Sequence, residues 1–320
     1  MRVLFAGSPA IAVPSLEALC NTEGIEMAGV LTNADTAKGR HGAPQPTEVG
    51  KAALRLLNIP VIKPEKLDMS VRESINSLKP DILISFAYGR IFGPKFMALF
   101  PLGGINIHPS LLPKYRGPSP VQAAILNRDT ATGISIQKLA AQMDSGDILA
   151  SRELQLTGKE TASYLSGIFS VMAAEMITDV LLKIADGTLV PVKQNHSLAS
   201  YCPLIKKDDG IINWNRRAAD IEAKIRAFDI WPLCRTIHNG RELILLKADV
   251  YEGHTLDKDA KNGQVLGIDK NNGILIQTGD GILSVTELQY QAKKALHWRD
   301  FLNGARDFAG YDHCPVILGN

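Results

Sequence analysis

Short apolar runs alternate with amphipathic segments along the first 187 residues. Each run has the length of a strand and is rich in Val, Ile, Leu or Phe, whereas the segments between them carry apolar residues at helical spacing. The expected strands are Val3–Ala6, Met27–Leu31, Pro60–Ile62, Asp81–Phe86 and Gly104–Ile107. Helices are expected at Thr47–Leu57 and Ser70–Leu78. This alternation predicts a doubly wound α/β sheet with parallel strands.

Two further elements complete this region, which we predict to be one domain over residues 1–187. Gly133–Leu139 has the pattern of an additional strand that extends the sheet. A long helix is expected from about Thr161 to Ala185, because apolar residues recur there every three or four positions. These apolar residues are Leu165, Ile168, Phe169, Met172, Met176, Val180 and Ile184. Gly187 fits the C-cap, where a residue in the left-handed region commonly ends a helix.

The pattern changes after Gly187. Residues 188–207 contain two prolines and no clear periodicity, so they are predicted to be a linker. Residues 208–320 begin with one helical segment, Arg216–Phe228, and continue with short strand candidates. The strand candidates are Leu243–Val250, Gly263–Ile268, Gly273–Thr278 and Gly281–Leu288. Asn-Gly and Asp-Gly turns separate some of them, and such turns favour hairpins, so a small antiparallel β-barrel is predicted.

Composition and charge exclude several classes of protein. The 320 residues are 45% hydrophobic and 21% charged, with a net charge of +2, which is typical of a soluble globular chain. No apolar run reaches transmembrane length, and the four cysteines show neither a CxxC pair nor zinc spacing. We therefore expect a cytoplasmic protein without a structural metal. Acidic and basic residues are nearly balanced beyond residue 190, so a nucleic acid would have to bind local basic patches.

Candidate catalytic residues lie at the end of the expected strand Gly104–Ile107. Side chains alternate along a strand, so Asn106 and His108 project from the same face, and Pro109 then ends the ladder. Asp144 follows the next expected strand. An amide, an imidazole and a carboxylate can together bind an oxyanion, transfer a proton and orient the imidazole. We expect the three side chains to meet within a few ångströms at the carboxyl edge of the sheet, although each residue taken alone is more often structural.

The segment Gly104–Gly117, with the sequence GINIHPSLLPKYRG, resembles the signature of the formyltransferases that use 10-formyltetrahydrofolate. Asp144–Ile148 resembles the second signature of that family. The resemblance implies that Asn106, His108 and Asp144 are catalytic and that 10-formyltetrahydrofolate is the co-substrate, with no metal. It also implies a Rossmann-like formyltransferase domain followed by a small OB-like β-barrel domain.

Formyl transfer to an amine passes through a tetrahedral oxyanion, which each well-placed hydrogen-bond donor stabilises by about 3–4 kcal/mol. We assign Asn106 as one such donor through its side-chain amide. His108, whose ordinary pKa is about 6.5, can donate to the oxyanion and help to transfer protons. Asp144 is expected to orient His108 and to favour its charged form. This chemistry needs no covalent enzyme intermediate.

The resemblance also places the pterin of the co-substrate beside the loop that leaves the strand Asp81–Phe86, where α/β folds commonly bind ligands. Gly89 would allow close approach of the backbone, and Tyr88 and Ile91 would form walls. Ser110 is interpreted as a turn or supporting hydroxyl near the site. The candidate residues around the co-substrate are Phe86, Tyr88, Gly89, Arg90, Ile91, Ser110 and Asp144. Without the Asn, His and Asp set, this loop would be an ordinary connection between a strand and a helix.

Two features indicate the formyl acceptor. The loop Asn33–Thr47 is long for a connection between a strand and a helix, and in the branch of the family that formylates methionyl-tRNA the equivalent loop enters the acceptor-stem region. A solvated lid is the alternative for this loop. The second feature is Ile225–Pro232, which is similar to an element of the same branch. We therefore expect a monomer that acts on initiator methionyl-tRNA. The candidate substrate-binding residues are Lys38, Arg40, Arg116, Lys206 and Arg226, with His41, Lys207, Lys293 and Lys294 as further cations.

Two other functions stay open at this point. A formyltransferase that acts on a small-molecule amine, such as a nucleotide sugar or a glycinamide ribonucleotide, would share Asn106, His108 and Asp144. Only the acceptor-binding parts discriminate between these enzymes, and Ile225–Pro232 favours tRNA. A catalytically inactive RNA-binding relative is the non-enzymatic alternative, and the intact set of three residues counts against it.

Overall fold

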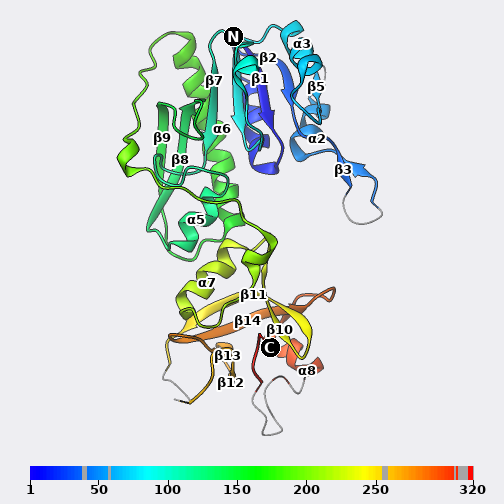
Figure 1. Cartoon of the computed structure of the whole chain (residues 1–320), viewed down its shortest axis with the longest axis vertical. Coiled ribbons are helices and arrows are strands. Elements are labelled where there is room, and N and C mark those ends of the chain that lie inside the picture. Colours follow the sequence, from blue (N-terminus) through cyan, green and yellow to red (C-terminus); the bar gives the residue numbers. More distant parts are fainter. Residues whose placement is uncertain (38–41, 57–58, 254–258, 306–307, 309–315, 320) are drawn as a thin grey trace. The chain divides into compact units, whose positions relative to one another are not determined.

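A computed structural model describes the chain except for residues 38–41, 57–58, 254–258, 306–307, 309–315 and 320 (Figure 1). The chain divides into two compact units. Unit 1 comprises Met1–Pro120, Ala131–Gln155 and Tyr164–Pro203, and unit 2 comprises Val121–Thr130, Leu156–Ser163 and Leu204–Asn320. The last change of unit therefore falls between Pro203 and Leu204, within the segment 188–207.

Unit 1 contains the alternating strands and helices that the apolar pattern predicts. Its strands are β1 (Arg2–Gly7), β2 (Glu26–Leu31), β3 (Thr36–Ala37), β4 (Pro44–Gln45), β5 (Val61–Ile62), β6 (Ile82–Phe86), β7 (Gly104–His108), β8 (Ala131–Lys138) and β9 (Ile148–Gln155). Its helices are α1 (Val13–Cys20), α2 (Glu48–Arg55), α3 (Met69–Ser77), α4 (Pro94–Met97) and most of α6 (Ala162–Ala185), with the short 3-10 helices η1 (Ala10–Ala12) and η2 (His196–Leu198).

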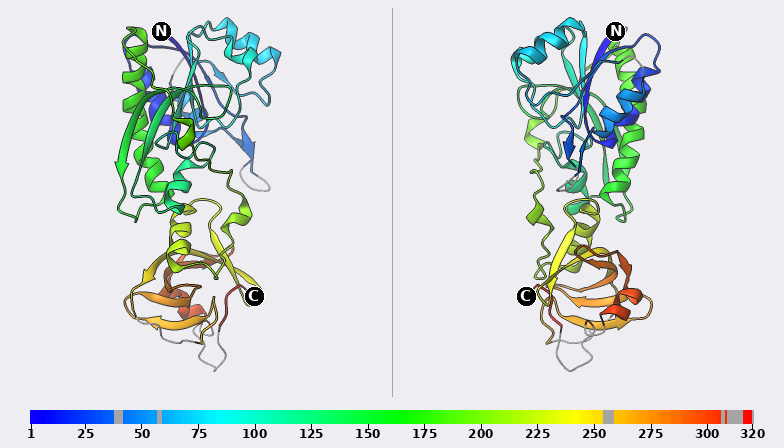
Figure 2. Two further views of the ribbon diagram at one scale, coloured as in Figure 1. Left: turned by 60° about the vertical axis from the view of Figure 1, so that its left-hand side comes forward. Right: turned by 90° about the vertical axis from the view of Figure 1, so that its right-hand side faces the viewer.

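Seven of these strands form one sheet in the order β5-β2-β1-β6-β7-β8-β9. The pairs from β5 to β7 are parallel, which confirms the doubly wound fold. The strand expected at Gly133–Leu139 is β8, and it runs antiparallel to both β7 and β9. Helix α3 covers one face of the sheet, and α1, α2 and α6 cover the other (Figure 2). Because helices cover both faces, the central strands are apolar on both sides.

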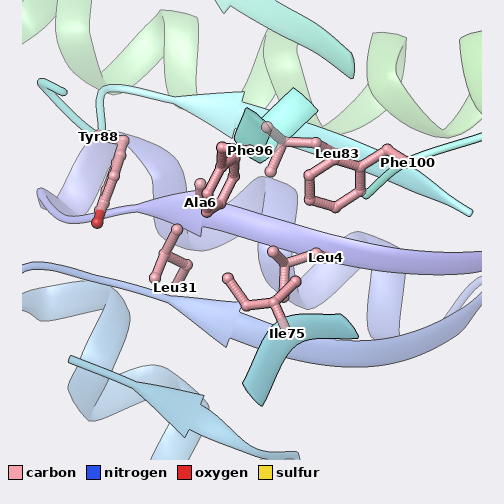
Figure 3. Close-up of a cluster of buried hydrophobic side chains, with 8 residues drawn as sticks. All are labelled: Leu4, Ala6, Leu31, Ile75, Leu83, Tyr88, Phe96 and Phe100. Atoms are coloured by element: carbon pink, nitrogen blue, oxygen red, sulfur yellow. The ribbon is translucent and has the colours of Figure 1, made fainter. Parts of the chain in front are cut away.

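The core of unit 1 lies between the sheet and the helices on its faces. One cluster of buried side chains joins strands β1, β2 and β6 to helices α3 and α4 (Figure 3). Its members are Leu4, Ala6, Leu31, Ile75, Leu83, Tyr88, Phe96 and Phe100. Tyr88 lies at one end of the cluster, where the chain leaves β6 (Figure 3). Burial of a large apolar side chain contributes about 1.5–3 kcal/mol, so this cluster holds the carboxyl end of β6 firmly in place.

Helix α6 corrects the expectation that no apolar segment reaches transmembrane length. By length and composition alone, this helix of 24 residues is apolar enough to cross a membrane. Its buried side chains, among them Leu165, Phe169 and Val180, recur at helical spacing. On its exposed side Asp179 pairs with Lys183, and Glu175 pairs with Arg152 of β9. This pattern is the one expected of a helix in the core of a globular domain.

Unit 2 consists of one antiparallel sheet with helices against it. Its strands are β10 (Cys234–His238), β11 (Arg241–Tyr251), β12 (Val265–Asp269), β13 (Gly273–Gln277), β14 (Ile282–Tyr290) and β15 (Leu296–His297). Its helices are α5 (Pro120–Leu126), which it shares with unit 1 at Pro120, α7 (Ala218–Ala227), α8 (Trp298–Gly304) and the 3-10 helix η3 (Lys207–Gly210).

The strands of unit 2 pair in the order β10-β11-β14-β13-β12, with β15 beside β14. All of these pairs are antiparallel, as predicted for the second domain. Asn239 and Gly240 join β10 to β11, and both have a positive φ, 47° and 70°, as a two-residue hairpin turn requires. Helix α7 packs against β11 and β14, and α8 packs against β14. Strands β10 and β15 were not predicted.

Candidate active site

Strand β7 positions the first two candidate catalytic residues. In the parallel pair with β6, Asn106 lies opposite Ser85, and in the antiparallel pair with β8 it lies opposite Gln137. Ile105 and Ile107 are buried on the other face of β7. Asn106 and His108 therefore share the opposite face of β7. They lie at the carboxyl end of this strand, close to the point where the chain leaves the neighbouring strand β6.

The structure brings Asn106, His108 and Asp144 together, as the sequence predicts. The amide nitrogen Nδ2 of Asn106 donates a 3.3 Å hydrogen bond to Oδ1 of Asp144. Nδ1 of His108 lies 3.6 Å from the other carboxylate oxygen, Oδ2. The His108 side chain is only 5% exposed and that of Asp144 is 11% exposed. The three groups thus form one site that is largely shielded from water.

A backbone carbonyl determines which nitrogen of His108 carries a proton. Nε2 lies 2.8 Å from the carbonyl oxygen of Tyr115. A carbonyl oxygen can only accept a hydrogen bond, so Nε2 must be the donor. Nδ1 is then the nitrogen that faces Asp144 and that can gain or lose a proton. The hydrogen bond to Tyr115 thereby selects the tautomer and holds the ring in one orientation.

Two groups that the sequence did not single out hold the carboxylate of Asp144. Nε2 of Gln137, on β8, donates to Oδ1 at 2.8 Å, and the backbone N–H of Gly117 donates to Oδ2 at 2.9 Å. Asp144 itself has a positive φ of 51°, a conformation that Asp tolerates better than most residues. Gln137 lies seven residues before Asp144 and Gly117 lies 27 residues before it, and neither spacing belongs to a helix or strand pattern that would predict the contact.

Glycines explain parts of both signature segments. A Cβ at Gly146 would lie 1.9 Å from the carbonyl oxygen of Lys138, and one at Gly117 would lie 2.3 Å from that of Cys202. Neither position has room for a side chain, and Gly117 also has a φ of 116°. The two glycines let the loops that carry Asp144 and Arg116 approach neighbouring backbone closely.

Burial is the largest influence on the charge of His108, and it lowers the pKa of the imidazole. Asp144 and the hydrogen bond to Tyr115 act in the opposite direction, but the net shift of the pKa is downward. Asp144 does favour the charged form of His108, as expected, but the effect of burial on the pKa is larger. Burial therefore favours the neutral imidazole, with its proton on Nε2 and its Nδ1 lone pair facing Asp144.

We expect the lowered pKa of His108 to make folding stability depend on pH. In the unfolded chain the imidazole has its ordinary pKa near 6.5, so the unfolded state binds the proton more tightly than the folded state. Stability should be unaffected by this residue above about pH 6.5 and should fall as the pH drops from there towards the folded pKa. Urea unfolding at several pH values, compared between the wild type and His108→Gln, measures the difference. An equal loss of stability in both proteins between pH 7 and pH 5 would show that His108 does not contribute.

The loop after β6 differs in part from its expected arrangement. Phe86 and Tyr88 are buried, so their side chains support the loop from beneath. Gly89 has a φ of 79° with open space where a Cβ would be, and Ile91 is 81% exposed. These two positions can approach a ligand.

Arg90 ties this loop to neighbouring backbone. Its Nε donates to Oδ1 of Asn33 at 2.9 Å, and its Nη1 donates to the carbonyl oxygen of Glu65 at 2.7 Å. Asn33 in turn donates to the carbonyl oxygen of Tyr88 at 3.1 Å. Arg90 therefore shapes the loop through contacts within unit 1.

Ser110 shapes the turn that follows β7. Its hydroxyl is buried and donates to the carbonyl oxygen of Lys114 at 2.6 Å. The backbone carbonyl of Ser110 accepts from the hydroxyl of Ser135 at 2.8 Å. The structure thus shows Ser110 as a turn hydroxyl, which is the interpretation given to it from the sequence.

Arg116, expected to contact substrate, is instead among the most buried side chains, with 2% of its surface exposed. Its guanidinium donates to Oε1 of Gln194 from both Nη2, at 2.6 Å, and Nε, at 3.2 Å. It also contacts the Tyr201 hydroxyl at 3.2 Å and Nδ1 of His196 at 2.9 Å. Arg116 therefore flanks the site, as expected, but its guanidinium is held by the protein's own groups and is not exposed to a substrate.

Arg226, a second expected substrate contact, is also engaged within its own unit. Its Nε and Nη2 donate to the two carboxylate oxygens of Glu222, at 2.6 Å and 3.0 Å, and its Nη1 donates to the carbonyl oxygen of Glu160 at 2.8 Å. A carboxylate four residues earlier on α7 thus neutralises the charge, so the expected phosphate contact needs correction as well. Lys206, by contrast, is exposed.

Lys38 and Arg40 lie outside the described residues. Strands β3 and β4, on either side of them, pair antiparallel, with Thr36 opposite Gln45. Both strands are exposed. The long loop Asn33–Thr47 therefore contains an exposed hairpin next to β2 and α2. Within the described part of the chain, no group of three or more His, Cys, Asp and Glu residues is placed to hold a metal ion.

Comparison with known proteins identifies relatives over nearly the whole chain. Residues 1–181 match the family described as formyl transferase, and residues 204–306 match the formyl transferase C-terminal domain. The methionyl-tRNA formyltransferase of Treponema denticola is 46% identical over 317 residues, which is 96% of this chain and 98% of that protein. That of Treponema pallidum is 43% identical over 95% of this chain and 97% of its own length. Among solved structures, the sugar 3N-formyl transferase WlaRD has a TM-score of 0.65 at 20% identity and covers 92% of this chain and 99% of its own, which shows a shared fold.

Proposed function

The chain belongs to the methionyl-tRNA formyltransferase family, and we propose that it transfers the formyl group of 10-formyltetrahydrofolate to the α-amino group of initiator methionyl-tRNA. The observation that carries the proposed chemistry is the contact between Asn106, His108 and Asp144 at the carboxyl end of β7. The loop after β6, the strand beside β7, has open space at Gly89 and an exposed Ile91. Both fit a flat ligand whose reactive end lies at Asn106, His108 and Asp144.

In the first step the amino nitrogen attacks the formyl carbon, and the carbonyl oxygen becomes an oxyanion. Asn106 supplies a donor for this charge. Its Nδ2 has two N–H groups, of which one points to Asp144, so the other is available for the oxyanion. Because Asp144 holds the amide in place before the reaction, the donor needs little rearrangement as the charge develops, and such a donor contributes about 3–4 kcal/mol.

In the second step a proton moves from the attacking nitrogen to the leaving nitrogen. Neutral His108 accepts this proton at Nδ1, since Nε2 is bonded to Tyr115. The imidazolium then lies 3.6 Å from the Asp144 carboxylate, which stabilises the new charge. The bond between the formyl carbon and N10 of the folate breaks, and His108 returns the proton to N10. The products are formylmethionyl-tRNA and tetrahydrofolate.

The proposed acceptor rests on the relatives and on two parts of the chain. The named relatives at 43–46% identity match nearly from end to end, including the second domain. We assign residues 1–187 to catalysis and residues 208–320 to tRNA binding, with 188–207 between them, in a cytoplasmic monomer. Lys38, Arg40 and Lys206 are the proposed phosphate contacts, because Arg116 and Arg226 are engaged inside their own units.

The test is formyl transfer from labelled 10-formyltetrahydrofolate to a panel of acceptors. Charged initiator tRNA should be formylated, whereas uncharged tRNA should not. An amino-sugar nucleotide and glycinamide ribonucleotide should react far more slowly, as judged by kcat/KM. A comparable kcat/KM with either small amine would overturn the proposed acceptor, and no transfer to any acceptor would overturn the proposed chemistry.

Shortening the hairpin between β3 and β4 should weaken the use of tRNA and leave folate use intact. Replacing residues 38–43 by Asn-Gly, a good two-residue hairpin turn, removes Lys38 and Arg40. We expect the KM for tRNA to rise, and the slope of log kcat/KM against log salt to shrink by about 0.7–0.9 for each phosphate that the variant no longer binds. Arg40→Ala should act in the same direction.

The matched control for the removal of one charge is Lys183→Ala, on the exposed side of α6. It should leave the KM for tRNA and the salt slope as in the wild type. A hairpin variant with an unchanged tRNA dependence would remove the loop from tRNA binding. A wild type whose kinetics do not respond to salt would exclude phosphate contacts altogether.

A further inference from the structure

Gln194 lies in the segment after α6 that the sequence predicts to be a linker, yet its side chain is buried in unit 1. The backbone beside it docks on the sheet, because Val192 and Ile148 of β9 exchange two hydrogen bonds of 2.8 Å. This docking carries Gln194 to the loop that contains Asp144. The segment is therefore part of the catalytic unit.

The amide of Gln194 is held by contacts on both of its ends. Its Nε2 donates to the backbone carbonyl oxygens of Asp144, at 2.9 Å, and Gly146, at 2.7 Å, and lies 3.2 Å from Oε1 of Gln137. Its Oε1 accepts from Arg116 at 2.6 Å and 3.2 Å. A guanidinium can only donate and a carbonyl can only accept, so the amide cannot be turned over.

These contacts form a directed chain that ends at the carboxylate. Arg116 donates to Gln194, the two N–H groups of Gln194 are shared among Gln137 and the backbone carbonyls of Asp144 and Gly146, and Gln137 donates to Oδ1 of Asp144 at 2.8 Å. The contacts of the Arg116 guanidinium among the described residues are the amide of Gln194, the hydroxyl of Tyr201 and the imidazole of His196. Hydrogen bonds in such a buried chain polarise one another, and removal of one member affects the others.

We propose that Gln194, oriented by Arg116, is a positioning residue for the catalytic carboxylate. The inference rests on the proposed function of Asp144. Gln194 fixes the backbone of Asp144 directly and its carboxylate through Gln137. Both links keep Oδ2 of Asp144 at its place beside Nδ1 of His108. Misplacement of a catalytic group by about 1 Å lowers a rate by about 10²-fold, so this support bears on turnover more than on substrate binding.

The first test is Gln194→Met, which keeps the size of the side chain and removes its hydrogen bonds. We expect kcat to fall about 10- to 100-fold, with the KM for folate and for tRNA within about twofold of the wild type. Val192→Ala, an exposed side chain in the same segment, is the control and should keep the normal kcat. A normal kcat for Gln194→Met, or an effect that appears only in KM, would overturn the proposal.

A double-mutant cycle with Asp144→Asn distinguishes positioning from general stabilisation. If Gln194 acts through Asp144, Gln194→Met should lower the rate much less in the Asp144→Asn background than in the wild type. An equal fold-change in both backgrounds would show that the two residues act independently and would overturn the proposal.

Gln194→Glu supplies a readout that does not depend on activity and serves also if Gln194→Met does not fold. The glutamate can still accept from Arg116, but it has no donors for the Asp144 loop and adds a negative charge there. The charged or titratable groups close by include His108, Asp144 and Arg116, then His196 and Tyr201, which contact Arg116, and Cys202, whose thiol lies 3.4 Å from the carbonyl oxygen of Arg116. The pKa of His108, followed by NMR of the imidazole, should shift in this variant, because the Asp144 carboxylate that favours the imidazolium loses its support and a new charge is added, and it should stay unchanged in Val192→Ala.

An unchanged His108 titration in Gln194→Glu would overturn the positioning role even if the enzyme formylates tRNA normally. A wild type that transfers no formyl group would overturn the proposed function instead. In that case the titration alone would still decide whether Gln194 acts on the group formed by His108 and Asp144.

Discussion

Replacing either His108 or Asn106 by alanine should lower kcat by about 10²–10³-fold and leave the KM for folate nearly unchanged. Asn106→Ala removes a donor that is already aimed at the developing oxyanion. His108→Ala removes the imidazole beside Asp144 that accepts the proton from the attacking amine in the proposed mechanism. Single-turnover formyl transfer with saturating folate and tRNA measures the chemical step separately from product release.

Two exposed residues of the same types provide controls. Asn21→Ala, after α1, and His297→Ala, on β15, should both retain the normal rate. His108→Ala also removes the hydrogen bond to the carbonyl of Tyr115, at a cost of about 0.5–1.5 kcal/mol of stability, so unfolding must be measured in parallel. Near-normal turnover of a folded His108→Ala or Asn106→Ala would remove that residue from the mechanism.

The elements that the sequence predicted best are the strands that are buried on both faces of the sheet. Strands β1, β6 and β7 are covered on both faces, so they form continuous apolar runs that are recognisable without their neighbours. Strand β9 escaped prediction because none of its residues is buried, and half of its sequence is polar. Strand β10, with the sequence CRTIH, escaped prediction for a different reason. It is short, and its polar residues Arg235 and Thr236 are buried, where they contact Glu242 and Trp214.

In the candidate site, too, contacts that follow from one strand were predictable from the sequence, whereas contacts between separate segments were not. Asn106 and His108 share a face because strand geometry requires it, and a sequence reveals that directly. The supports of Asp144 come from Gly117, Gln137 and Gln194, which are brought together only by the tertiary fold. A glutamine in a segment without periodicity carries no signal of its own, so the segment was interpreted as a linker.

The two misplaced arginines illustrate how a charge can be hidden. Arg226 has Glu222 four residues before it, a spacing that brings the two side chains together on a helix, so its pairing was readable in the sequence. Arg116 has no such neighbour, and its partners Gln194 and Tyr201 lie far along the chain. Its burial follows from the fold alone.

Replacing Asp144 by asparagine should lower kcat by at least about 10²-fold, through an effect on His108 that the geometry makes specific. The carboxylate accepts from Asn106 and Gln137 on Oδ1 and from Gly117 on Oδ2. An amide in its place would keep its oxygen towards the first two donors, because the reverse orientation would set its NH₂ against both. Its NH₂ would then replace Oδ2, so the N–H of Gly117 would lose its acceptor and an N–H would face the Nδ1 lone pair of His108 that accepts the proton.

Asp144→Asn should therefore lower the pKa of His108 further than burial already does, because the variant stabilises the neutral ring and removes the negative charge that favours the imidazolium. NMR titration of the imidazole, together with kcat between pH 5 and pH 9, measures both effects. A higher pH should not restore the rate, because the neutral ring is already the form present. A His108 pKa that rises in the variant, or a kcat close to that of the wild type, would contradict the assignment of Nδ1 as the proton acceptor and Asp144 as the partner of the imidazolium.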